Sequence, residues 1–195
     1  FEETQAPQEL MYRDWVVQKP RWVAALVVLG CALAAGLLGP IAIDIEGESP
    51  MTAQTLLILL PGLLFGWEVG LAASVLYLIA GGLGAPVFAH FTSGWARFTG
   101  TTGGYLLAFP MAALLVGWWA PSGKRFRFLR SGVLLFAGQI LIVALGMAWQ
   151  RNIVPLEGGI WSAVEPLLPG LVMKTAVGTL ILTGIARVVD RARRN

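Results

Sequence analysis

The sequence predicts an all-α membrane protein of six transmembrane helices, from its composition, its apolar segments and the placement of its cations. Of its 195 residues, 56% are hydrophobic and only 13% are charged, whereas soluble domains carry about 25% charged residues. These polar groups are too few to cover a water-facing surface, which indicates that lipid surrounds much of the exterior. The length predicts one compact domain.

Six apolar segments are long enough to be considered as spans, because a helix needs about 20 mostly apolar residues to cross the hydrocarbon layer. The first is 22–43. Segments 51–66 and 69–83 are shorter and are split by Gly66-Trp67-Glu68, so we expect two short helices joined by a tight turn. The remaining three candidates are 103–119, 129–149 and 167–189.

The cations predict the orientation of these spans. Basic clusters precede the first span, separate the fourth from the fifth and follow the sixth. An even number of spans places all three clusters on one side, which the positive-inside rule assigns to the cytoplasm. The two long loops, 84–102 and 150–166, then face outward, and the loop between helices 3 and 4 is the expected ligand-binding loop.

We therefore divide the chain into three parts. Residues 1–20 are predicted to be a cytoplasmic tail or surface helix, 21–190 the six-helix domain and 191–195 a basic cytoplasmic tail. No leader of the secretory type precedes the first span, so we expect no cleaved signal peptide.

The residue types argue against catalysis by this chain. It has no P-loop, HExxH or GxSxG motif, and His90 is its only histidine. A membrane acyl- or glycosyltransferase would need an acid/base pair or metal ligands at membrane depth. We therefore expect no catalytic residue, no metal, no cofactor bound by this chain and no nucleic-acid partner. A non-catalytic scaffold is a remaining alternative, and it predicts no small-molecule binding.

Segment 77–109 combines closely spaced glycines with aromatic and hydroxyl side chains. Glycines let backbone N–H groups approach a ligand, and a helix N-terminus favours a carboxylate. Aromatic walls with a few fixed polar groups are typical of small-molecule pockets. Close helix packing is the alternative interpretation of the glycines. The candidate ligand-binding residues here are Tyr77, Phe88, His90, Arg97, Thr101, Thr102, Gly103, Gly104 and Tyr105.

Two further places carry polar groups in apolar sequence. Lys174 lies inside the sixth span, where a charge costs a few kcal/mol, so we expect it to face a polar cavity; snorkelling to the outer interface is the alternative. Thr52 and Gln54 lie at the start of the second span, where they either line the mouth of a pocket or cap the helix.

Four motifs carry a family resemblance. They are Pro50-Met51-Thr52-Ala53-Gln54 (PITxQ in the family), Tyr77 to Ala89 (YLxxGxxGxPVFA), Gly100 to Phe109 (GPTGGYLxGF) and Pro169 to Lys174 (PGDxxK). With these motifs, over about residues 20–190, the chain resembles the BioY family, the substrate-binding subunits for biotin in energy-coupling factor (ECF) transporters.

The resemblance implies a capture subunit, without its own ATPase, in the bacterial cytoplasmic (inner) membrane. It would bind extracellular biotin with high affinity and work with a membrane-embedded coupling subunit and two cytoplasmic ATPases that use ATP. Aromatic side chains would stack on the bicyclic ring, and the groups around Thr101 to Gly104 would meet the valerate carboxylate, with Arg97 as a counter-ion or only solvated. The small residues Gly30, Ala32, Ala34 and Gly36 would dock the coupling subunit, or pack against the chain's own helices.

Two positions depart from the family pattern. Thr101 replaces a proline, and Leu171 replaces an aspartate that the family associates, with the lysine, with the polar ring end of biotin. A leucine accepts no hydrogen bond. Either another group, such as Glu165, Gln54 or a backbone carbonyl, takes over, or the ligand is a different vitamin or acyl acid such as lipoate.

Overall fold

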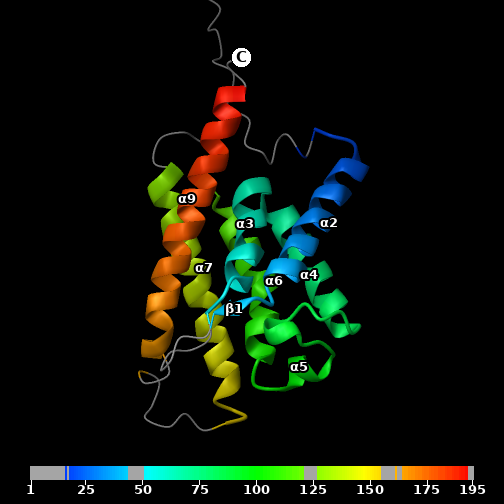
Figure 1. Ribbon diagram of the computed structural model, residues 1–195, viewed down its shortest axis with the longest axis vertical. Coiled ribbons are helices and arrows are strands. Elements are labelled where there is room, and N and C mark those ends of the chain that lie inside the picture. Colours follow the sequence, from blue (N-terminus) through cyan, green and yellow to red (C-terminus); the bar gives the residue numbers. More distant parts are fainter. Residues whose placement is uncertain are drawn as a thin grey trace, which may run out of the picture.

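The computed structural model describes residues 16, 18–43, 51–120, 127–154, 161 and 164–192. All six predicted spans are helices in these ranges (Figure 1). They are α2 (Arg21–Leu38), α3 (Gln54–Phe65), α4 (Trp67–Gly82), α6 (Gly103–Trp118), α7 (Arg127–Gln150) and α9 (Leu168–Ala192). Residues 1–15 and 17 of the predicted tail or surface helix, and residues 155–160 and 162–163 of the loop 150–166, lie outside the described residues.

Short elements join these helices. Strands β1 (Ala42–Ile43) and β2 (Met51–Thr52) pair antiparallel, with Ala42 opposite Thr52. The connection between α4 and α6 contains the 3₁₀ turn η1 (Ala89–Phe91) and the short helix α5 (Ala96–Thr99), and the 3₁₀ turn η2 (Glu165–Leu167) leads into α9.

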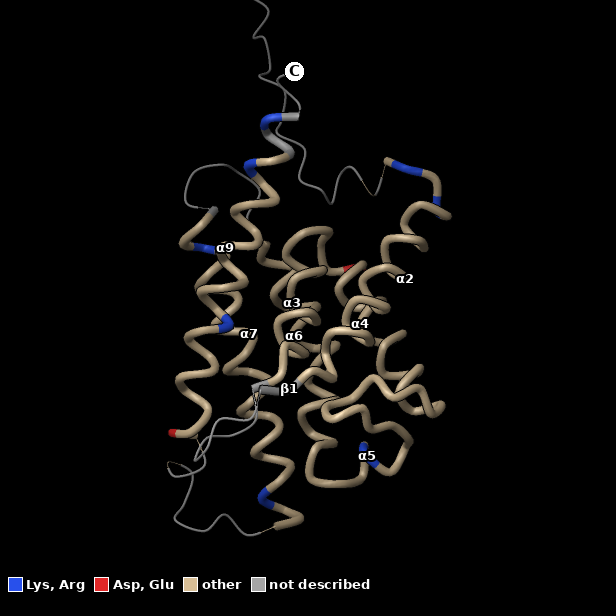
Figure 2. Tube along the Cα trace, viewed as in Figure 1, with Lys and Arg blue, Asp and Glu red and all other residues tan. Residues whose placement is uncertain are grey.

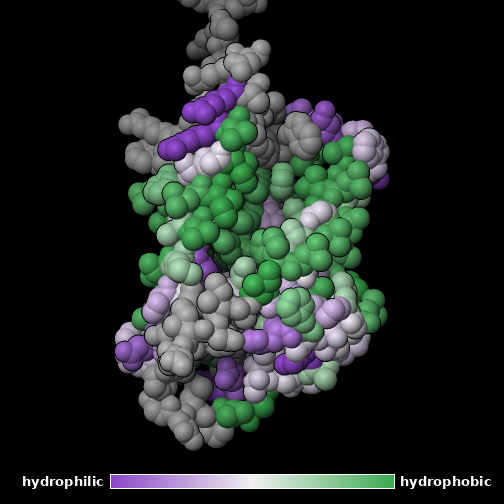
Figure 3. All heavy atoms as spheres, viewed as in Figure 1, coloured by the Kyte–Doolittle hydropathy of each residue, from purple (hydrophilic) through white to green (hydrophobic). Residues whose placement is uncertain are grey.

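Three helices are long and apolar enough to cross a membrane, namely Arg21–Leu38, Phe128–Gln150 and Glu165–Val188, and α3, α4 and α6 are shorter apolar helices. Large hydrophobic side chains are exposed along them, including Leu26, Leu33 and Leu37 on α2. Figure 3 shows hydrophobic residues gathered across the middle of one face, with hydrophilic residues toward both ends. The chain is therefore a multi-pass membrane protein.

Helix α6 lies at the centre of the bundle, packed against α7, α4 and α3. Small residues make this close packing possible: Ala112 and Ala113 are fully buried. A Cβ on Gly117 would lie 2.6 Å from the Cα of Trp67, and a Cβ on Gly70 would lie 2.8 Å from the Cα of Gly62. The backbones of α3, α4 and α6 thus touch. Close backbone packing is the usual way in which helices associate in a membrane, because lipid is as apolar as the side chains and the hydrophobic effect does not drive the helices together.

A tight turn joins α3 to α4 at Gly66, as predicted. Its φ of 91° lies in the left-handed region that glycine adopts without steric cost. The turn lies at the end of the molecule where α2 begins and α9 ends, and α5 lies at the opposite end (Figure 1). Most of the coloured cations also lie near the first of these ends (Figure 2); the described ones there include Lys19, Arg21, Arg130, Arg187 and Arg191.

Replacing Gly117 by alanine is expected to destabilise the bundle, because the new Cβ would meet backbone atoms of α4 that cannot rotate away. Overpacking of this kind costs about 1–3 kcal/mol, which lowers the melting temperature by roughly 2–10 °C for a chain of this size. Thermal unfolding in detergent measures the shift. Gly184→Ala is the matched control, since a Cβ there meets nothing within 4 Å; equal melting temperatures for the two variants would contradict the packing at Gly117.

Candidate functional site

The hydroxyl of Tyr77 joins three separate parts of the chain. Tyr77 lies on α4 and is buried. Its oxygen accepts a hydrogen bond from Nε2 of Gln54 at the start of α3, and it donates one to the carbonyl oxygen of Val87 at 2.7 Å. Gln54 is buried as well. Through Tyr77, the amide of Gln54 therefore holds the connection between α4 and α6 in place. No side-chain hydrogen bond caps the start of α3.

An aromatic cluster folds this connection, residues 83–102, over the end of α4. The ring of Phe88 is buried and meets Tyr77 edge-on with centroids 5.7 Å apart, and it meets Phe98 at 5.8 Å. Trp95 stacks on Phe98 at 5.1 Å. Two glycines of α4 provide the seat: a Cβ on Gly81 would collide with the ring of Phe88, and one on Gly82 would lie 2.8 Å from Trp95. For these glycines, close packing is the interpretation that the geometry supports.

The turn η1 has an unusual backbone. His90 and Phe91 both have φ of 56°, a left-handed conformation that non-glycine residues rarely adopt, and both side chains are exposed. The amide of His90 donates to the carbonyl of Pro40 at 3.2 Å, so the turn is tied to the end of α2. Strained residues of this kind persist where surrounding contacts fix them, often at functional sites.

The predicted anion-binding segment packs against α7. Cβ atoms on Gly103 and Gly104 would collide with Phe98 and Trp149 respectively, and Nε1 of Trp149 donates to the carbonyl of Gly100 at 3.0 Å. Gly103 and Gly104 thus have a packing role, and a ligand contact through their N–H groups stays a prediction.

The other candidates of this segment differ in exposure. Thr101 and Thr102 are exposed at the start of α6, and Arg97 on α5 is half-buried. Tyr105 packs on Gly146, and its hydroxyl donates to Oε1 of Gln150 at 3.2 Å. Of this group, the threonines and Arg97 are the side chains best placed to meet a ligand anion.

Lys174 is half-buried on α9, and Leu171, one turn earlier, is buried. The opposing face of α7 carries Gln139, which sequence reasoning missed. Gln139 is 1% exposed, and its Nε2 donates to Oγ1 of Thr175 at 2.9 Å. Its signal was a lone amide within an apolar span, since polar side chains at membrane depth are usually functional or paired.

An apolar groove of about 360 Å³ runs between α2, α4 and residues 85–91. Ala32 and Gly36, two of the four residues predicted to dock a partner, line it. A Cβ on Gly36 would lie 3.0 Å from Cγ1 of Val87, whereas one on Gly30 would meet nothing within 4 Å. Gly36 therefore serves internal packing, and Gly30 lies on an open surface of α2; Ala34 is half-buried.

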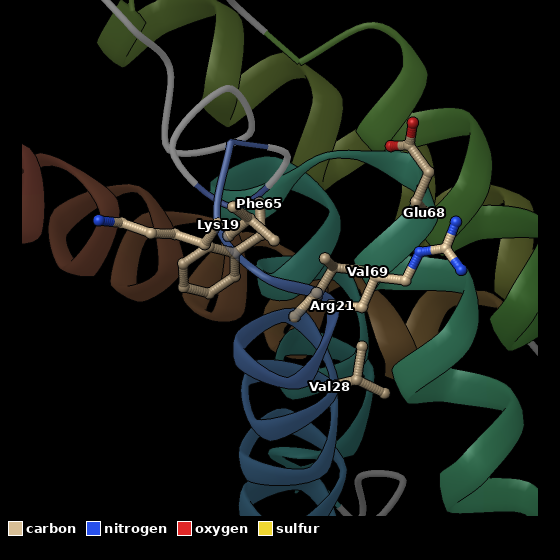
Figure 4. A pocket seen from close by; sticks show the side chains of 8 residues that line it. Lys19, Arg21, Val28, Phe65, Glu68 and Val69 are labelled. Carbon is tan, nitrogen blue, oxygen red and sulfur yellow. The ribbon is translucent and has the colours of Figure 1, made fainter.

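A second pocket, of about 270 Å³, lies at the end of the molecule where α2 begins. In Figure 4 the side chains of Lys19 and Arg21 extend to opposite sides of it, with Val28 and Val69 between them. It is far along the chain's helices from residues 83–102 and holds none of the predicted ligand residues. Among the residues that the structure describes, no group of three His, Cys, Asp or Glu side chains could hold a metal ion.

Comparison with known proteins gives a consistent result. The model of the BioY family matches residues 11–191. A probable biotin transporter BioY of Pyrococcus horikoshii is 34% identical over 69% of this chain and 79% of its own length. The biotin transporter BioY2 of Lactococcus lactis is 36% identical over 70% of this chain and 72% of its own. The crystal structure of an S-component for biotin from an ECF-type ABC transporter superposes with a TM-score of 0.67 at 21% identity, covering 86% of this chain and 90% of the other.

Replacing Tyr77 by phenylalanine is expected to loosen residues 85–92. The change leaves the buried amide of Gln54 and the carbonyl of Val87 without a partner, at a cost of about 1–3 kcal/mol. Hydrogen exchange should quicken at the amides of Phe88 and His90, which now bond to Thr92 and Pro40. Tyr105→Phe serves as the control, because its hydroxyl bonds to Gln150 instead. Unaltered exchange in Tyr77→Phe would show that the aromatic packing alone holds the turn.

Proposed function

The chain belongs to the BioY family, and we propose that it is the high-affinity capture subunit of an ECF-type biotin importer. It binds extracellular biotin and passes it on through a coupling module driven by partner ATPases. The observation that carries the proposal is the half-buried Lys174 in the segment of α9 that is long and apolar enough to cross a membrane. A charge is retained at that depth where it meets a polar cavity or a ligand.

The proposed topology has six spans with both termini in the cytoplasm of a bacterial inner membrane. It is supported by the cations at the end of the molecule where α2 begins and α9 ends, opposite α5 (Figure 2). The short helices α3, α4 and α6 cross together with their flanking residues. Residues 83–102 and the start of α9 then face the outside, where the substrate arrives.

In the proposed site, Lys174 on α9 binds the polar ring end of biotin. Thr101, Thr102 and Arg97 are the groups that meet the valerate carboxylate, because they are the exposed or half-buried polar side chains at the start of α6 and on α5. Tyr77 and Phe88 are buried, so they support the loop, and His90 and Phe91 lie at its exposed turn. Thr52, at the end of β2, and Gln54 border the same end of the bundle.

The importer further requires a membrane-embedded coupling subunit and two cytoplasmic ATPases. Helix α2 offers the docking face, since it is the least covered of the three long apolar helices and Gly30 lies open on it. No ATP-binding motif is present in the sequence, so ATP is used by the partners.

A related acyl acid such as lipoate is the second candidate ligand. Buried Leu171 favours it, because a leucine at this place offers no acceptor for the ring N–H groups of biotin. Mass spectrometry of the ligand that copurifies with the chain separates the two candidates.

Purified full-length chain in detergent is expected to bind biotin without ATP. Lys174→Met should weaken binding by at least about tenfold, since a charge-assisted hydrogen bond contributes about 1.5–3 kcal/mol. Isothermal titration calorimetry gives both affinities, and Arg187→Met, an exposed cation of the same helix, provides the comparison. Full affinity in Lys174→Met would remove the lysine from the site, and no biotin binding by the folded wild type would refute the proposed ligand.

The topology is tested with single cysteines in a Cys31→Ala background, because Cys31 is the only native cysteine. A membrane-impermeant maleimide applied to intact cells should label Arg97→Cys. Arg130→Cys should be labelled only after the cells are permeabilised. The reverse pattern would invert the proposed orientation.

A further inference from the structure

Gln139 has a buried carbonyl oxygen with nothing to bond. Its Nε2 donates to Oγ1 of Thr175 at 2.9 Å and contacts the carbonyl of Leu135 at 3.4 Å. Its Oε1 is fully buried and has no hydrogen-bond partner. An unpaired buried acceptor costs about as much as a lost hydrogen bond, so its retention in an apolar helix calls for a function.

The orientation of this amide is fixed by its neighbours. The carbonyl of Leu135 can only accept, so the nitrogen of Gln139 must face it. The hydroxyl of Thr175 donates to the carbonyl of Leu171 at 2.8 Å, which leaves its oxygen to accept from the same nitrogen. Turning the amide over would break both contacts. Oε1 is therefore the atom of the amide that has no hydrogen-bond partner.

Helix periodicity places Gln139 and Lys174 at the same level of the α7–α9 contact. Gly178 of α9 packs against Leu135 of α7 and Leu56 of α3, since a Cβ on Gly178 would meet both side chains. Residues four apart share a helix face. Gln139 thus lies one turn from Leu135, and Lys174 one turn from Gly178, each in the direction of the proposed outer end. The hydrogen bond from Gln139 to Thr175 confirms that the two levels coincide.

We propose that Oε1 of Gln139 and the ammonium of Lys174 together recognise the cyclic urea of the ligand, with Leu56, Leu135 and Gly178 forming the apolar floor beneath them. This inference rests on the proposed function. The ammonium donates to the urea carbonyl, and Oε1 of Gln139 accepts from a ring N–H. A urea presents these two complementary groups, and the dithiolane ring of lipoate presents neither. Gln139 therefore supplies the acceptor that Leu171 lacks, and it selects for biotin.

A purely structural role for Gln139 makes a different prediction. Polar side chains often join membrane helices, and the bond from Nε2 to Thr175 does so here. That bond would be lost equally in Gln139→Met and Thr175→Val, because the first lacks the donor and the second lacks the acceptor. Only the proposed acceptor role distinguishes them, since Thr175→Val keeps Oε1 of Gln139 and Gln139→Met does not.

The test measures biotin affinity of the purified full-length chain by calorimetry, with thermal unfolding as a check on folding. Gln139→Met is expected to weaken binding about 10- to 100-fold, and Thr175→Val to stay within about threefold of wild type because it leaves Oε1 of Gln139 in place. Thr179→Val is the control: Oγ1 of Thr179 bonds to the backbone of Thr175 in the same helix contact, and its loss should leave affinity unchanged.

A biotin analogue methylated at its ring nitrogens gives a second measurement, the ratio of the affinities for biotin and for the analogue. A purely structural role of Gln139 would leave this ratio unchanged. Wild type should prefer biotin over the analogue, and Gln139→Met should lose most of that preference. Wild-type affinity in Gln139→Met, or an equal loss in Gln139→Met and Thr175→Val, would overturn the role of Gln139 while leaving the biotin-binding function intact. Failure of the folded wild type to bind biotin would instead remove the proposed function itself.

Discussion

The two hydrogen bonds of the Tyr77 hydroxyl are the interactions on which the end of the bundle formed by residues 83–102 depends. It accepts from Gln54 and donates to Val87, so one buried oxygen fixes α3, α4 and the connection to α6 relative to one another. In lipid no water is available to satisfy such groups, so a partner within the chain avoids the cost of leaving them unpaired. The aromatic contacts of Phe88 and Phe98 then have a fixed base on which to pack.

Glycines have a packing role in both halves of the bundle. At one end, Gly62, Gly70 and Gly117 bring three helix backbones into contact. At the other, Gly81 and Gly82 give room to aromatic rings of the loop, and Gly104 gives room to Trp149. The same residue type thus sets the helix spacing and the position of the loop. The elements of the proposed site are consequently carried by a closely packed framework, which would order that site before a ligand arrives.

The two polar groups proposed to recognise the ring lie on two different helices. Lys174 on α9 and Gln139 on α7 lie one turn from an apolar contact that includes Leu56 of α3. A pair made of one donor and one acceptor can discriminate among ligands more strongly than apolar packing does, because a mismatched ligand leaves buried groups unpaired. The replacement of the family's aspartate by Leu171 is then compatible with a conserved chemistry supplied from another helix.

The sequence by itself determined the membrane environment, the six helices and their approximate limits, and the tight turn at Gly66, because these depend on local hydropathy and on backbone preferences. It also indicated Lys174 as a candidate ligand group, through the cost of a charge among apolar neighbours; that role stays a prediction. Only the tertiary structure decided that Gln54 is bonded to Tyr77, that Gly103 and Gly104 face Trp149 and Phe98, and that Gln139 lies beside α9. These are contacts between residues far apart in the chain. When nearly every residue of a helix is apolar, hydrophobic periodicity does not show which face meets the neighbouring helix, and that face is decided by packing.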